Sequence, residues 1–202
     1  MSPARPARRL LLPALAALWL AACASGPDIP PHYYQLRVEP PEALPAAGAA
    51  AEGLWQLVLP VRMPEYLERN VLWLPTGSSG LQQIEGHRWA EPLSEAVPRI
   101  VGNDLSLLRG PGRVWSGALP AGVQATRQLR LEVLSLEAAA DRRSVLLNAR
   151  WTLSDPQGQA PLQPGQARIS VPAEGPAPDQ LVAAHRLALW RLAQRLVAID
   201  GR

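Results

Sequence analysis

The chain of 202 residues has a single cysteine and no phenylalanine, and all 20 of its basic residues are arginine because lysine is absent. One cysteine cannot form an internal disulfide, so packing and hydrogen bonds must hold the fold together. The most apolar stretch, residues 10–20, has only about half the roughly 20 residues that a membrane-spanning helix needs. The sequence therefore excludes a disulfide-stapled domain and predicts no spanning helix in this stretch.

The N-terminal segment has the composition of a secretory signal. Its first residues carry three arginines, Arg5, Arg8 and Arg9, and residues 10–20 that follow are mostly leucine and alanine. A basic start, a short apolar run and small residues at the cleavage point are the three parts of such a signal. We therefore expect residues 1–22 to be removed after export.

The end of this segment resembles a bacterial lipobox, in which small residues precede a cysteine. The lipobox residues are Leu20, Ala21 and Ala22, and Cys23 is the predicted site of lipidation. The resemblance implies a diacylglyceryl group on the cysteine and an acyl chain on the amino group that cleavage frees. Such an anchor is effectively permanent, since each buried CH₂ contributes about 0.8 kcal/mol. The alternative is an ordinary signal peptide that ends near a cysteine.

The charge balance changes once the signal is removed. The formal net charge is +3, and Arg5, Arg8 and Arg9 supply the whole excess. The remaining chain, roughly 180 residues, is neutral overall and has the length of one domain with a sizeable core. A nucleic-acid-binding protein needs a clustered basic surplus, so no nucleic-acid partner is expected.

The residues that follow Cys23 are expected to form a tether. Residues 24–31 contain three prolines and a glycine and have almost nothing that a core could bury. Such a segment is semi-extended at up to about 3.1 Å per residue, so it can hold a domain roughly 25 Å from the lipid headgroups. The predicted organisation is a lipidated cysteine with its tether over residues 23–32 and a single domain over residues 33–202.

Alternation of apolar and polar residues predicts the strands. The predicted ranges are 33–38, 54–62, 70–74, 81–84, 128–136, 144–153 and 168–171. The clearest pair is 128–136 and 144–153, which the polar turn at residues 141–143 joins as an antiparallel hairpin. Pro60 argues that the strand over 54–62 lies at an edge or ends near this residue.

Two segments have the three-and-four spacing of helices that pack on a sheet. The first covers residues 92–108, although Pro98 and Gly102 inside it should kink or fray it. The second is a long helix that starts at residue 178. Strands, a helix, more strands and a last helix predict an α/β (α+β) single domain, with a mixed, mostly antiparallel sheet and two main helices packed on it.

Four blocks of the sequence, taken in order, resemble the ABC-type transport auxiliary lipoprotein family. The first block, residues 59–72, is an apolar strand, a Pro-x-Tyr-Leu step and a second strand. The others are residues 88–93, residues 103–105 and the end of the hairpin at residues 149–153. The departures are Pro98 in the first helix and the aliphatic Leu134 and Leu136, near which the family often has an aromatic side chain. Within the blocks, the family positions expected to be structural are Pro64, Tyr66, Leu67, Trp89, Pro92, Leu93 and Trp151.

The resemblance implies a non-catalytic accessory lipoprotein. Its expected partner is a mammalian-cell-entry (MCE) type subunit of a periplasm-spanning, ABC-linked lipid transport system, and its expected role is docking in support of outer-membrane integrity. A ring of identical copies is one expected arrangement. Ala24 and Ser25 lack the aspartate that retains lipoproteins in the inner membrane of enteric bacteria, which favours the outer membrane.

The residues themselves indicate no catalytic or metal site. The three histidines, His32, His87 and His185, lie far apart and lack metal-site spacing, so no metal and no cofactor are expected. The stretch from Gly77 to Gly80 lacks the lysine of a phosphate-binding loop, and a hairpin turn explains it better. A periplasmic hydrolase is therefore disfavoured. A carrier lipoprotein with a large apolar cavity of its own stays open as the alternative function.

The last helix offers a candidate partner contact. Trp190 falls away from the apolar stripe through Leu192, so an exposed indole beside Arg186 and Arg191 would suit a protein or headgroup contact. Burial of Trp190 against a neighbouring strand is the equal alternative.

Overall fold

The computed structural model describes residues 30–45 and 52–199. Contacts divide the chain into two units, Met1–Pro31 and His32–Arg202, and every described helix and strand belongs to the second. Cys23, Leu20, Ala21 and Ala22 lie outside the described residues.

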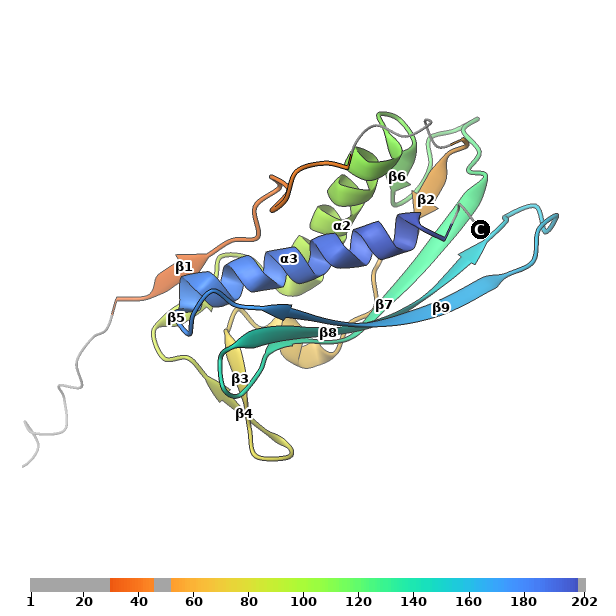
Figure 1. The fold of residues 1–202 in the computed structure, drawn as a ribbon. Helices are drawn as coiled ribbons and strands as arrows, with labels where there is room; N and C mark the ends of the chain where they lie inside the picture. Colours follow the sequence, from red (N-terminus) through yellow and green to blue (C-terminus); the bar gives the residue numbers. More distant parts are fainter. Residues whose placement is uncertain (1–29, 46–51, 200–202) are drawn as a thin grey trace, which may run out of the picture. The chain divides into compact units, whose positions relative to one another are not determined.

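A five-stranded sheet with the strand order β6-β2-β7-β8-β9 forms the centre of the second unit (Figure 1). The strands are β2 (Trp55–Leu57), β6 (Val114–Ser116), β7 (Arg127–Ala138), β8 (Ser144–Ser154) and β9 (Gln163–Pro172). The short strand β2 runs parallel to β6 and β7, whereas the long strands β7, β8 and β9 are antiparallel. The mixed sheet follows the predicted fold class.

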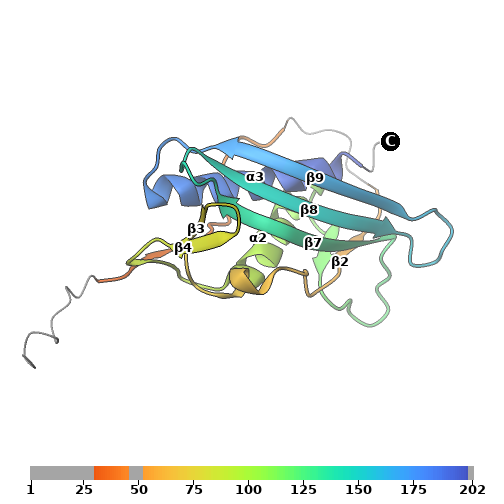
Figure 2. The same ribbon diagram turned by 90° about the horizontal axis from the view of Figure 1, so that it is seen from below.

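Two helices, α2 (Leu93–Arg109) and α3 (Pro178–Val197), cover one face of this sheet, and the other face is open along most of β7, β8 and β9 (Figure 2). The alternation of β7 and β8 explains the arrangement, because Leu129, Leu131, Leu147 and Leu153 are all buried beneath the helices. The alternate positions face away from the helices and are mostly polar, with Leu134 and Leu146 as exposed exceptions. These strands therefore have one face in the core and one in solvent.

The remaining elements form two small sheets at one end of the domain. Strand β1 (His32–Tyr34) pairs in parallel with β5 (His87–Trp89), and β3 (Trp73–Thr76) forms an antiparallel hairpin with β4 (Gly80–Gln83). A short 3₁₀ helix, η2 (Glu65–Glu68), precedes the hairpin.

The predicted hairpin of β7 and β8, the turn into β4 and the long last helix are confirmed. Several boundaries were wrong. Strand β1 stops at Tyr34, β3 starts only at Trp73, β9 starts already at Gln163, and β2 stops at Leu57, so that Leu59 is exposed. Strand β2 also lies between two strands and not at an edge. Pro60, which has no N–H to donate, lies beyond the end of β2 as expected.

Helix α2 runs without interruption through Pro98 and Gly102, so the expected fraying was wrong. Pro98 lies in the second turn, where its missing N–H removes one hydrogen bond while its ring is buried. Gly102 brings the helix against β6, since a Cβ there would collide with the Oγ of Ser116. Packing on the sheet thus outweighs the local cost of both residues.

Candidate functional site

The family positions lie in the core or at helix starts. Leu67, Trp89 and Leu93 are buried and line, together with His185, a cavity of about 10 Å³. Trp151 is buried, Tyr66 is half-buried, Pro64 precedes η2 and Pro92 precedes α2. In the part of the chain that the structure describes, these residues pack the domain, and Trp151 also lines the groove described below.

This packing bears on the alternative function of a lipid carrier. A site for even a drug-sized molecule occupies about 300–1,000 Å³. The cavity beneath the helices is far smaller, because leucine, alanine and tryptophan side chains fill the space between helices and sheet. The structure of the described residues therefore does not support a carrier with a large interior cavity.

Trp190 is fully buried, so of the two alternatives the exposed indole was wrong and burial is what the structure shows. It lies four residues after Arg186, on the side of α3 that faces α2, and the guanidinium of Arg186 is 6.0 Å from its ring centroid. Helix α3 packs on α2 as well as on the sheet, so residues on two of its sides are buried.

Arg186 forms a buried ion pair with Asp104 of α2. Its two terminal nitrogens donate to the carboxylate oxygens at 2.7 and 2.6 Å, and its Nε donates to the carbonyl of Arg37 at 2.8 Å. Burial raises the pKa of Asp104, and the guanidinium acts in the opposite direction. We call Asp104, Arg186 and the segment at residues 37–38 the clasp, because it joins α2, α3 and the chain after β1. Arg186 therefore binds groups inside the domain and is not available as a surface contact for a partner.

Arg191 is the one residue of the candidate partner contact that remains at the surface. It forms an ion pair with Glu42 and a hydrogen bond with Gln194. An exposed pair of this kind contributes little to stability.

The histidines occupy two different environments. His185 is buried, with Nδ1 2.7 Å from the carbonyl of Leu181 and its ring edge-on to Trp89, and burial lowers its pKa to about 4. Its Nδ1 therefore carries the proton and donates to that carbonyl. His32 and His87 stack at 5.3 Å where β1 meets β5, and Tyr34 Oη lies 2.9 Å from Nδ1 of His87.

The open face of the sheet contains a groove of about 570 Å³. The outward-facing side chains of β7 and β8 that line it are Arg130, Glu132, Arg150 and Thr152. In the segment after β2, the backbone of Arg62 forms an isolated parallel β-bridge with Glu132, and Arg62 also lines the groove. The groove walls are Val58, Pro60 and Pro164.

One ion pair occupies the middle of this groove. Arg150 holds Glu132 through two hydrogen bonds of 2.7 and 2.9 Å. Arg150, with a smaller contribution from Arg62, lowers the pKa of Glu132. Arg62 and Arg130 make no side-chain hydrogen bond or ion pair with the described residues. The groove therefore has an excess of positive charge.

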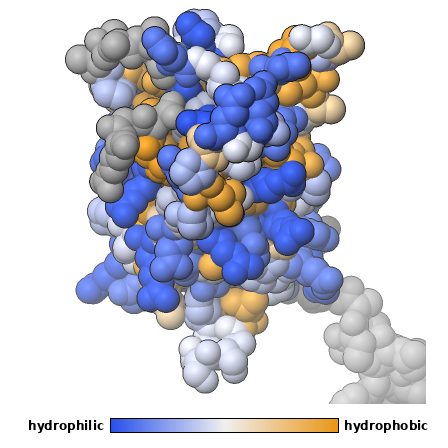
Figure 3. Space-filling model, turned by 90° about the vertical axis from the view of Figure 1, so that its right-hand side faces the viewer, coloured by the Kyte–Doolittle hydropathy of each residue, from blue (hydrophilic) through white to orange (hydrophobic). Residues whose placement is uncertain are grey.

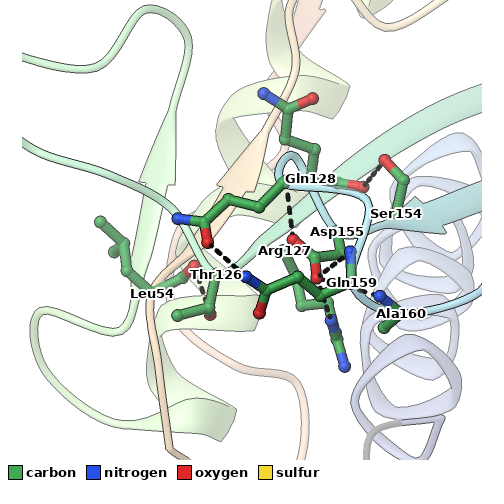
Figure 4. Close-up of polar contacts among 9 residues, drawn as sticks. Leu54, Thr126, Arg127, Gln128, Ser154, Asp155, Gln159 and Ala160 are labelled. Atoms are coloured by element: carbon green, nitrogen blue, oxygen red, sulfur yellow. Dashed lines mark hydrogen bonds and ion pairs between the residues drawn. The ribbon is translucent and has the colours of Figure 1, made fainter.

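The carboxylate of Asp155 organises the loop from β8 to β9 (Figure 4). Its oxygens accept the N–H groups of Gln157, Gln159 and Ala160 at 2.8 to 3.1 Å, and Arg127 lies 3.9 Å away. These bonds fix the start of β9 and with it Pro164 in the wall of the groove.

The edge of the sheet at β6 carries exposed apolar side chains. Trp115 of β6 and Leu59 both lie beside the loop at residues 117–118: Leu59 is next to Gly117, and Trp115 Nε1 donates to the carbonyl of Ala118. Figure 3 shows one end of the domain, where apolar side chains are interspersed with hydrophilic ones. Scattered apolar groups of this kind are normal on protein surfaces.

Sequence reasoning missed the groove. Its arginines come from three segments: Arg62 follows β2, Arg130 lies in β7 and Arg150 in β8. The parity of Arg130 and Glu132 in β7 was a usable signal, since both alternate with buried leucines. The position of Arg62 depends on the path of the chain after β2, which the sequence does not reveal.

Among the described residues, no group of three or more histidine, cysteine, aspartate or glutamate side chains is arranged to hold a metal ion. In the same part of the chain, no helix has the length and apolar character needed to cross a bilayer.

The family model for the ABC-type transport auxiliary lipoprotein component matches residues 34–197. The intermembrane transport lipoprotein PqiC of Escherichia coli is 31% identical over 145 residues, which cover 72% of this chain and 73% of that protein. PqiC of Shigella flexneri matches to the same extent.

Solved structures share the fold at low sequence identity. A crystal structure of a protein from Xanthomonas campestris has a TM-score of 0.68 at 15% identity, over 84% of this chain and 96% of that one. Another has a TM-score of 0.67 at 19% identity, over 84% of this chain and 98% of that one. These likenesses concern the fold alone.

The fold and the family match define a single-domain α/β component of a transport system. The chain belongs to the ABC-type transport auxiliary lipoprotein family and is similar to PqiC over most of its length.

Proposed function

We propose that this protein is an outer-membrane-anchored accessory lipoprotein of an MCE-type, ABC-linked intermembrane lipid transport system. In this role it docks on a periplasm-spanning subunit and supports outer-membrane integrity. The observation that carries the proposal is the family match over residues 34–197, which includes nearly every described element. The name of the E. coli relative, an intermembrane transport lipoprotein, supports the same role.

The filled core supports docking over carriage. A protein that moves lipid inside itself needs an apolar cavity, whereas the cavity beneath α3 measures about 10 Å³. A docking component needs a rigid domain with a defined surface. The clasp between α2 and α3 and the long hairpin of β7 and β8 make such a domain.

The anchor follows from the sequence. We propose that residues 1–22 are removed, that Cys23 carries the acyl chains and that a tether through residue 32 leads into one domain over residues 33–202. The outer membrane is the proposed destination because Ala24 and Ser25 follow the cysteine. A ring of identical copies around the tip of the spanning partner would present several anchors to one leaflet.

We propose no catalysis for this protein. The relatives that it matches are named as transport lipoproteins. Among the described residues, the titratable groups of the open groove are one ion pair and two arginines, which offer neither a nucleophile nor a general base.

The test is a pull-down of the native lipidated protein from crosslinked cell envelopes. We expect a periplasm-spanning MCE-type subunit to be recovered in a fixed ratio, and we expect this recovery to be lost when Cys23→Ala removes the anchor. Recovery of no transporter subunit from the wild-type protein would contradict the docking role. An intact permeability barrier in cells that have only the Cys23→Ala protein would contradict the role in membrane integrity.

A further inference from the structure

The groove on the open face of the sheet has positive charge that the described residues do not neutralise. It contains three arginines and one carboxylate, and Arg150 already binds that carboxylate, Glu132, through two hydrogen bonds. Arg62 and Arg130 form no such bond within the described chain. Two guanidinium groups therefore remain for an anion from outside.

The backbone places these two arginines on either side of Glu132. Arg62 is held beside it, because its N–H donates to the carbonyl of Leu131 and its carbonyl accepts the N–H of Val133. Arg130 lies two residues before Glu132 and so on the same face of β7. A guanidinium is always charged, and its planar set of N–H donors fits the oxygens of a phosphate group.

The walls of the groove have a different chemistry. Val58 and Pro60 form one side and Pro164 the other, and none of these side chains offers a hydrogen bond. A volume of about 570 Å³ lies within the usual range for small-molecule sites. Charged groups in the middle and apolar walls beside them suit an amphiphile, with its phosphate on the arginines and its glycerol and first methylenes on the walls.

We propose that this groove binds the phosphate-bearing headgroup of a phospholipid, with Arg62 and Arg130 as its phosphate contacts. This proposal rests on the proposed function, in which the protein works where lipids pass between membranes. A free phosphate would leave the apolar walls without a partner. An acidic protein segment would bring further carboxylates next to Glu132 and would gain nothing from the proline walls.

The test uses the lipidated protein in a non-ionic detergent and measures binding by isothermal titration calorimetry. The ligands are dihexanoylphosphatidylglycerol, glycerol 3-phosphate, which lacks the acyl chains, and monohexanoylglycerol, which lacks the phosphate. Titration into protein-free micelles corrects for partition into detergent. We expect the phospholipid to bind at least tenfold more tightly than either fragment, and we expect its affinity to fall as salt is added.

The variants identify the site. Arg62→Gln with Arg130→Gln should weaken phospholipid binding at least tenfold. The matched control is Arg168→Gln, which removes an exposed arginine of β9 outside the residues that line the groove and should leave binding unchanged. Thermal unfolding by circular dichroism verifies that both proteins remain folded, as expected for substitutions at exposed side chains.

Three results would overturn the proposal. The first is that the double variant binds the phospholipid as tightly as the wild type does. The second is that glycerol 3-phosphate binds as tightly as the phospholipid, and the third is that a glutamate-rich peptide binds more tightly than both. The in vitro measurement is independent of docking. Crosslinked envelopes separate the two ideas further, since we expect the double variant to recover the spanning subunit while the permeability barrier fails. If the wild-type protein recovered no spanning subunit, that result would instead overturn the proposed function.

Discussion

The clasp offers the sharpest test of how this domain is held together. Asp104 is completely buried and Arg186 is 6% exposed, so neither charge has water to replace its partner. Removing one partner of a buried pair costs about 3–5 kcal/mol, because the other charge stays buried and unpaired. After Asp104→Ala, Arg186 still donates to the carbonyls of Arg37 and Val38, at 2.8 and 3.4 Å. We therefore expect the lower end, a loss of about 3 kcal/mol in the free energy of unfolding.

Two further variants distinguish the cost of an unpaired buried charge from the cost of lost packing. Asp104→Leu with Arg186→Met removes both charges and should unfold within about 1 kcal/mol of the wild type, since apolar side chains can replace a buried pair. It also removes the donors to residues 37 and 38, so amide exchange there should accelerate. Arg186→Met alone leaves burial as the main influence on Asp104, which raises its pKa. Protons then favour the folded state, so this variant should lose less stability at pH 5 than at pH 8.

The assay is urea unfolding of the lipidated protein in a non-ionic detergent, followed by tryptophan fluorescence and, for residues 35–39, by hydrogen exchange. The reasoning is refuted if Asp104→Ala unfolds within about 0.5 kcal/mol of the wild type. It is equally refuted if the double variant is as unstable as the single ones, because the loss would then come from packing and not from an unpaired charge.

Two further predictions concern the core. The pKa of His185 is about 4 in the folded protein against 6.5 in the unfolded chain, so between these pH values only the unfolded state binds the proton. The free energy of unfolding should therefore fall by about 3 kcal/mol as the pH drops from 6.5 to 4. In urea unfolding, His185→Met should flatten this pH dependence, whereas His32→Gln should preserve it. Gly165→Ala should cost about 1–3 kcal/mol, since its Cβ would lie 2.5 Å from the ring of Trp151 across the β8–β9 pair. Trp151→Leu should relieve that clash in a double-mutant cycle, and a Gly165→Ala protein with wild-type stability would contradict it.

The sequence predicted the elements whose pattern is strong and local. The hairpin of β7 and β8 alternates over 10 paired positions, and α3 has an apolar stripe from its first turn to its last. It could not predict β5 and β6, each three residues long, because their parallel pairing joins segments far apart in the chain. Short strands of this kind carry too few residues for a period to be recognised.

The candidate contact on α3 failed for a physical reason. A helix on a sheet exposes the side opposite its stripe, and on that basis exposure of Trp190 was one of two equal alternatives. Helix α3 also packs against α2, so a second side is buried, and Arg186 finds its counterion 82 residues away in Asp104. The sequence records neither the second helix contact nor the distant partner, and a single charged residue on a helix is more often solvated.

The central claim is that acyl chains on Cys23 fasten this domain to a membrane, where it serves its transport system. Mass spectrometry of the N-terminal peptide of the mature protein, purified from outer-membrane fractions, tests this most directly. The account predicts a chain that begins at Cys23 with a diacylglyceryl group on the sulfur and an acyl group on the nitrogen. A mature chain with a free thiol at Cys23, or one cleaved at another residue, would contradict it.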